Sequence, residues 1–117
     1  PKNLRFISDD GKGVRSSKVM FDAMTIAAER GLCVMSHAED MDLSPIDYRL
    51  AENLETARNL YIAMSTGAHL HMCHVSTKEA MEDILTARRR GVNVTCEVGP
   101  HHIWFYDFNY RVNPPIR

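Results

Sequence analysis

Three segments of the chain repeat one pattern, in which a glycine separates a helix-like stretch from a short apolar strand. The phrases read ERGLCVMSH, STGAHLHMCH and RRGVNVTCE. A glycine in this position ends a helix, because it adopts the left-handed conformation without steric cost. Each strand then ends in a side chain suited to metal binding or acid–base chemistry, namely His37, His74 and Glu97. The repeat predicts alternating helices and strands with reactive groups at the strand ends.

The stretches before the glycines carry apolar residues at the spacing of one helix face, which predicts helices over 16–30, about 48–65 and 77–90. Ser16 or Ser17 is expected to cap the first helix. The phrase STKE predicts a capping box, with Ser76 as the N-cap and Glu79 reaching back to it. With LRFIS as an opening strand, the order is β-α-β-α-β-α-β. That order is typical of an α/β parallel sheet with strands buried on both faces.

The composition of the chain limits which kind of protein it can be and which partners it can bind. The chain has 117 residues, 44% of them hydrophobic and 25% charged, which predicts one soluble globular domain over residues 1–117. Its net charge is −1 and its arginine run, 88–90, resembles a solvated helix end, so nucleic acid is not an expected partner. Neither a bilayer-spanning stretch nor a signal peptide is recognisable, which predicts a cytoplasmic protein without a membrane partner. The odd set of three cysteines indicates reduced thiols.

The carboxyl ends of parallel strands meet at one edge of the sheet, where α/β enzymes keep their sites. The groups expected at this edge are Asp9, Asp10, His37, His74 and Glu97. Each group alone has an ordinary explanation as a turn residue, a helix cap or a hydrogen-bonded histidine. Together, imidazoles and carboxylates at the ends of four consecutive strands are the usual ligands of Zn²⁺ in catalytic sites.

The stretch AHLHMCHVST, residues 68–77, is divided by the two-residue period of a strand. One face carries His69, His71 and Cys73, and the other face carries His74. His74 is the best metal candidate because it ends the strand, whereas His69 and His71 lie deeper and are expected to be structural. Cys73 is a core thiol by default but lies near enough to the edge to join a site. The pair His101 and His102 follows Pro100 and is expected either to be structural or to orient the site, without binding metal directly.

Several of these motifs, taken in order, resemble the dihydroorotases of the amidohydrolase superfamily. The matching segments are ISDDGKGV, SHAED, CHVSTKEA, TCEVGPHHI and VNPPIR, and together they span nearly the whole chain. The resemblance implies a partial TIM (β/α)8 barrel comprising about strands four to seven with the intervening helices. It also implies a metal-dependent hydrolase that interconverts N-carbamoyl-L-aspartate and dihydroorotate in pyrimidine biosynthesis, using one or two Zn²⁺ ions.

The resemblance also assigns roles to individual residues. His37 and His74 correspond to metal-binding histidines of the fifth and sixth barrel strands. Asp10 corresponds to an aspartate that bridges two metals, in place of the carboxylated lysine of related enzymes. Cys73 and Glu97 correspond to further metal contacts in some members. The last assignment is Asn113 in VNPPIR, which matches an asparagine that contacts substrate.

Two elements of the family pattern are missing from the sequence, the His-x-His pair of the first strand and the general-base aspartate of the eighth. A closed barrel needs roughly 200 to 250 residues. The chain is therefore expected to be one part of a barrel, inactive alone, that associates with the rest of the barrel or with copies of itself. Two alternatives stay open: a related cyclic amidohydrolase of the hydantoinase or allantoinase type, and a non-catalytic dihydroorotase-like scaffold.

Overall fold

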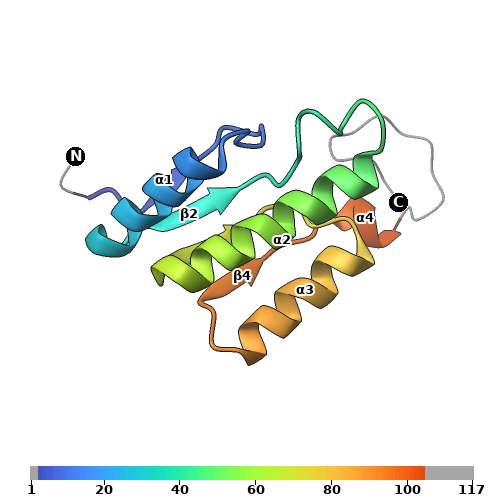
Figure 1. Ribbon diagram of the computed structural model, residues 1–117. Coiled ribbons are helices and arrows are strands. Elements are labelled where there is room, and N and C mark those ends of the chain that lie inside the picture. The colour runs from blue at the N-terminus through green and yellow to red at the C-terminus, as the bar shows by residue number, and fades with distance from the viewer. Residues whose placement is uncertain (1–2, 105–117) are drawn as a thin grey trace.

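The computed structural model describes residues 3–104, which form the predicted alternation of strands and helices (Figure 1). The elements in chain order are β1 (Phe6–Ser8), α1 (Ser17–Arg30), β2 (Cys33–Ser36), α2 (Tyr48–Thr66), β3 (His69–Met72), α3 (Lys78–Arg89), β4 (Val94–Cys96) and α4 (Pro100–Trp104). The order from β1 to β4 confirms the expected α/β pattern. The short helix α4 was not predicted, because this five-residue element begins at Pro100, directly after Gly99, and is too short to show a helical period.

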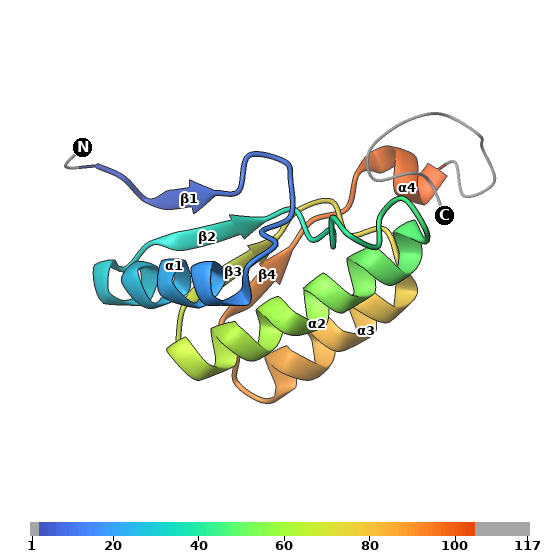
Figure 2. The same ribbon diagram turned by 45° about the horizontal axis from the view of Figure 1, so that its top comes forward.

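The four strands form one parallel sheet in the order β1-β2-β3-β4. The register places Val34 of β2 beside Leu70 of β3, and Leu70 beside Val94 of β4. Helices α1, α2 and α3 all lie against one face of this sheet (Figure 2). Since every strand runs in the same direction, the carboxyl ends of all four strands lie at the same edge.

Only one face of the sheet is covered by helices in the part of the chain that the structure describes. On β3, Leu70 and Met72 are buried toward the helices, whereas His69 and His71 on the opposite face are half-buried. The expectation of strands buried on both faces is therefore met on one face only. The alternation along β3 matches the predicted two-residue period.

The core lies between the sheet and the three helices. Its largest fully buried side chains include Met24 from α1, Leu70 from β3 and Ile84 from α3. Burying each such side chain contributes about 1.5–3 kcal/mol. This layer holds the strand ends in place and thereby fixes the edge at which the candidate site lies.

The helix caps agree with the sequence at α1 and differ at α3. The Ser16 hydroxyl accepts a hydrogen bond from the N–H of Val19, so Ser16 is the N-cap of α1. At α3 the N-cap is Thr77, which accepts from the N–H of Ala80, and the prediction of Ser76 was wrong. The reason is tertiary, because buried Glu52 of α2 binds both the hydroxyl and the N–H of Ser76.

The other half of the predicted capping box also has a different partner. Glu79 pairs with Arg49 of α2, at 2.8 Å between Nη2 and Oε2, and links the starts of α2 and α3.

Among the described residues, no helix is long and apolar enough to cross a membrane.

Candidate metal centre

The first candidate group lies where β1 and β2 end. Asp9 directly follows β1, and His37 directly follows β2. Oδ1 of Asp9 lies 2.6 Å from Nδ1 of His37, and Oδ2 accepts the backbone N–H of His37 at 2.8 Å. The Asp9 side chain is only 4% exposed, so both of its contacts are shielded from water. A carboxylate on one ring nitrogen fixes the histidine tautomer and leaves the other nitrogen for a metal.

The second histidine of the group comes from the end of β3. The rings of His37 and His74 lie 5.0 Å apart between centroids and are tilted by 54°. His74 has a φ of 34°, a turn conformation that is uncommon for a side chain other than glycine. Burial lowers the pKa of His74, and the neighbouring His37 lowers it further. Its imidazole is therefore kept neutral, which is the form that binds metal ions.

The structure places Asp10 differently from Asp9. Asp10 is exposed, has a φ of 60°, and donates its N–H to the hydroxyl of Ser8 at 3.1 Å. Within residues 3–104, the carboxylate that reaches His37 is that of Asp9. The chain turns sharply at Asp10, so adjacent carboxylates acquire different surroundings. The metal-bridging role expected for Asp10 stays a prediction.

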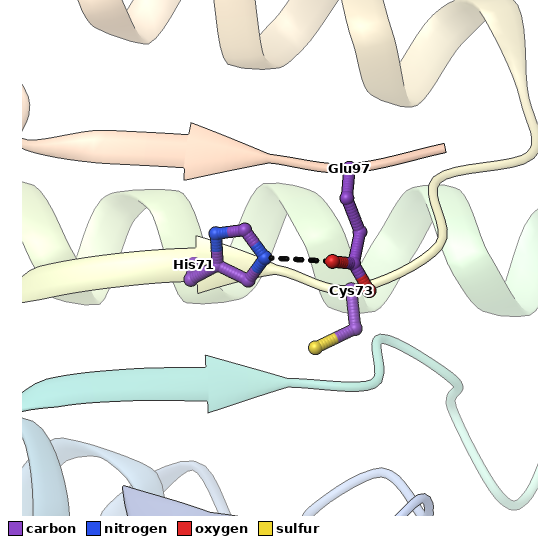
Figure 3. Close-up of side chains that lie close together, drawn as sticks. All are labelled: His71, Cys73 and Glu97. Carbon is purple, nitrogen blue, oxygen red and sulfur yellow. Dashed lines mark hydrogen bonds and ion pairs between the residues drawn. The ribbon is translucent and has the colours of Figure 1, made fainter. Parts of the chain in front are cut away.

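A second group of donors lies on the face of the sheet away from the helices (Figure 3). One ligand atom each from His71, Cys73 and Glu97 lie within 4.8 Å of one another, which is close enough for one metal ion. Nε2 of His71 is 3.4 Å from Oε2 of Glu97. The sequence predicts Cys73 and Glu97 as metal candidates and His71 as a structural residue. The two-residue period of the strand could have predicted this role of His71, because it places His71 on the same strand face as Cys73.

The two groups are neighbours in electrostatic terms. Burial, together with smaller contributions from the negative charges of Glu97 and Asp9, raises the pKa of the Cys73 thiol to about 11. Cys73 therefore interacts electrostatically with one carboxylate of each group, Asp9 of the first and Glu97 of the second. A cation bound among these side chains would offset that negative charge, and imidazole nitrogen, thiolate sulfur and carboxylate oxygen are the donors that Zn²⁺ prefers. The residues present fit a zinc ion.

The remaining histidines have other contacts. Nε2 of His69 and Nδ1 of His71 lie 3.4 and 2.8 Å from the hydroxyl of Thr95. The rings of His101 and His102 lie 4.1 Å apart, and Nδ1 of His102 accepts the N–H of Gly99. Neither His101 nor His102 belongs to the three-donor group found among the described residues. The substrate contact expected at residue 113 lies outside the described residues.

Comparison with known proteins relates this geometry to one family. No family model matches the chain. Over 97% of its length, however, the chain is 53% identical to a protein named dihydroorotase from Clostridium botulinum. It is also 39% identical to a dihydroorotase from Lactobacillus gasseri over 95% of its length. The chain belongs to the dihydroorotase family. This finding confirms the resemblance carried by the motifs SHAED and CHVSTKEA.

The dihydroorotase relatives are much longer than this chain, which spans 29% and 32% of these two proteins. Among solved structures, a D-hydantoinase (dihydropyrimidinase) from Thermus sp. superposes with a TM-score of 0.79 and 25% identity, over 97% of this chain and 31% of the neighbour. A D-hydantoinase from a Bacillus species gives 0.81 at 23% identity, over 97% and 31% respectively. These neighbours are TIM-barrel amidohydrolases, so the fold prediction of a partial barrel is confirmed.

Proposed function

We propose that the whole protein is a metal-dependent dihydroorotase that interconverts N-carbamoyl-L-aspartate and dihydroorotate. The observation that carries the proposal is the meeting of His37 and His74 at 5.0 Å, beside the buried carboxylate of Asp9. This meeting occurs at the carboxyl edge of a parallel sheet, where barrel enzymes hold their catalytic groups. The 53% identity to a dihydroorotase supports the choice of reaction.

The metal in this proposal is Zn²⁺, with one or two ions per site. A bound zinc ion polarises an amide carbonyl and lowers the pKa of water. This chain would hold the metal ligands. Oδ1 of Asp9 lies 2.6 Å from Nδ1 of His37, and a proton on Nδ1 would leave the lone pair of Nε2 for the metal. His74 is proposed as the second imidazole ligand, with a ring kept neutral by burial.

Further roles in the proposal come from the family motifs. Asp10 is proposed to bridge the metals, Cys73 and Glu97 to add metal contacts, and Asn113 to bind substrate. The separation of Cys73, Glu97 and His71 by no more than 4.8 Å between ligand atoms supports the second of these roles. The protein is further proposed to act in the cytoplasm, in pyrimidine biosynthesis, as an assembly of the complete barrel or of several copies.

One alternative enzyme is favoured by a specific observation. The solved structures that superpose on the chain include hydantoinases, at 25% identity or below. The much higher identity to dihydroorotases favours dihydroorotate over hydantoins as the substrate. A non-catalytic scaffold would keep the fold but not the turnover.

The experiment uses the full-length protein that contains this chain. Purified protein is assayed for zinc content and for hydrolysis of dihydroorotate and of hydantoin, with His37→Asn and His74→Asn as test variants. Asp42→Asn is the control, because Asp42 is exposed and its carboxylate pairs with Arg15 at the surface, at 3.8 Å. We expect dihydroorotate turnover on the order of 1 to 10³ per second in the wild type and the control. Both histidine variants should lose zinc and turnover. Hydantoin turnover without dihydroorotate turnover would establish the alternative enzyme, and no turnover of either would indicate a scaffold.

A further inference from the structure

One buried carboxylate joins two of the loops that carry candidate site residues. Glu55 lies on α2, and its side chain is 2% exposed. Oε1 of Glu55 accepts the N–H of Val14 at 3.0 Å, and Oε2 accepts the N–H of Glu39 at 3.1 Å. Val14 lies in the loop after β1, and Glu39 lies in the loop after β2. These loops begin with Asp9 and His37, so each oxygen of Glu55 binds the loop of one partner in that pair.

The two loops and the carboxylate are in direct contact. A Cβ added at Gly13 would lie 1.8 Å from the carbonyl oxygen of Glu39 and 2.3 Å from Oε2 of Glu55. Real Cβ atoms do not approach other atoms so closely, so only glycine fits there. The loop after β1 therefore packs against the loop after β2 with Glu55 at the junction.

Arg58, one turn further along α2, completes the junction. Its Nη2 donates to Oε1 of Glu55 at 3.0 Å, and its Nη1 donates to the carbonyl of Val14 at 2.7 Å. Both backbone polar groups of Val14 are thus bound by α2. The guanidinium also offsets the negative charge of Glu55, which is needed because an unpaired buried charge is strongly destabilising.

We propose that Glu55 is a positioning residue for the metal centre, because it sets the place of the Asp9 loop relative to the His37 loop through one carboxylate. The expected effect of Glu55 on metal binding rests on the proposed function, since zinc is proposed to bind at the pair Asp9–His37. Glu55 itself touches neither partner of that pair. Its geometric effect passes through the backbone of residues 9–14 and 37–39, and its negative charge also acts on Asp9 through space.

A second buried carboxylate on the same helix supplies a matched comparison. Glu52 accepts the N–H groups of Ser76 and Thr77 with Oε1, at 2.8 and 3.1 Å, and contacts the Ser76 hydroxyl with Oε2. A glutamine at this position keeps its oxygen on the two N–H groups, and its amide donates to the hydroxyl, which accepts as well as donates. Glutamine in place of Glu52 therefore preserves these three contacts.

Glutamine in place of Glu55 cannot do the same. The oxygen atoms of Glu55 each face a backbone N–H, so the amide NH₂ of glutamine meets a donor on one side. Arg58 favours the oxygen on the Val14 side. The bond to the N–H of Glu39 is the one that Glu55→Gln breaks, and the His37 loop is released.

The test compares Glu55→Gln with Glu52→Gln in the full-length protein. Amide hydrogen exchange is measured by mass spectrometry on the metal-free protein, and Co²⁺ is used as the spectroscopic probe of the site. For Glu55→Gln we expect faster exchange in residues 37–44, an altered Co²⁺ visible spectrum, and Co²⁺ affinity lower by about tenfold. Glu52→Gln should stay close to the wild type in the exchange of residues 37–44. Asp42→Asn, at an exposed position, should stay close to the wild type in both Co²⁺ measurements.

The outcomes separate this inference from the proposed function. Wild-type exchange and a wild-type Co²⁺ spectrum in Glu55→Gln would overturn the positioning role, as would equal changes in both variants. If the wild type binds Co²⁺ without turning over dihydroorotate, and Glu55→Gln still alters the spectrum, positioning stands and the proposed function fails. Should Glu55→Gln not fold, Arg58→Lys is measured instead. It is expected to speed exchange in residues 9–16 and weaken Co²⁺ binding, and wild-type behaviour would again overturn the inference.

Discussion

Replacing Asp9 with asparagine is the most direct perturbation of the proposed metal centre. Asp9 makes two contacts to one residue, at 2.6 Å to Nδ1 of His37 and at 2.8 Å to the N–H of His37. An asparagine that keeps its oxygen on the backbone N–H turns its NH₂ toward Nδ1. Nδ1 must then accept, so the ring proton moves to Nε2 and occupies the lone pair proposed for the metal. The opposite orientation of asparagine loses the backbone bond.

The size of the effect follows from the burial of Asp9. Its side chain is 4% exposed, so water does not replace a lost partner. A hydrogen bond to a charged group contributes about 1.5–3 kcal/mol net. At 1.4 kcal/mol per factor of ten, this corresponds to about a 10- to 100-fold loss of zinc affinity, the range measured for partners of metal-binding histidines.

Zinc affinity is measured by competition with a chromophoric chelator, in the full-length protein at neutral pH. Asp42→Asn makes the same chemical change at an exposed position and serves as the control. Asp10→Asn is measured in parallel, because the family motif assigns the bridging role to Asp10. An Asp9→Asn protein with the zinc affinity of the control would refute the reasoning. If Asp10→Asn keeps the zinc content of the wild type, then Asp9, and not Asp10, is the aspartate that supports zinc binding.

Three further predictions concern stability and thiol reactivity. Burial raises the pKa of Glu55 from 4.5 to about 7, so the folded state holds this proton more tightly than the unfolded state. The contribution of Glu55 to the free energy of unfolding is therefore fully present below pH 4.5. It is lost as the pH rises from 4.5 to about 7, by up to about 3 kcal/mol. Urea unfolding of the wild type should show this slope, and Glu55→Gln should lack it. The pKa of about 11 at Cys73 predicts slower alkylation by iodoacetamide at neutral pH than for an ordinary cysteine, followed by mass spectrometry of its peptide; a rate equal to that of a free thiol would contradict it. Leu70→Ala, at a fully buried position of β3, should cost about 2–5 kcal/mol in urea unfolding. Leu54→Ala, at a position 46% exposed, should cost much less, and equal costs would contradict the assignment of the core.

The fold was predictable because its signals are local. Helix periods, the serine cap at Ser16 and the glycines after each helix are decided by residues close in sequence, and the predicted helix over 16–30 differs from α1 by one residue. The cap of α3 was not predictable in the same way. Ser76 has the chemistry of a cap, but Glu52, far away in the sequence, takes its hydroxyl.

The candidate site likewise has features that were predictable from the sequence and features that were not. The convergence of His37 and His74 followed from parallel strands, since residues at strand ends must meet at one edge. The choice between Asp9 and Asp10 did not, because it depends on the turn at Asp10, where φ is 60°. The inclusion of His71 depends on the neighbouring strand β4, which brings Glu97 to within 3.4 Å.

The sequence by itself determined the order of elements, the parallel sheet and the family, because periodicity, capping and ordered motifs are properties of neighbouring residues. Only the tertiary structure decided which carboxylate reaches which histidine and which loops share the buried Glu55. Contacts such as Oε2 of Glu55 to the N–H of Glu39 join different elements at 3.1 Å. Their geometry depends on how α2 packs against the sheet, and side-chain directions beyond a strand end follow the turn that the chain makes there rather than the strand period.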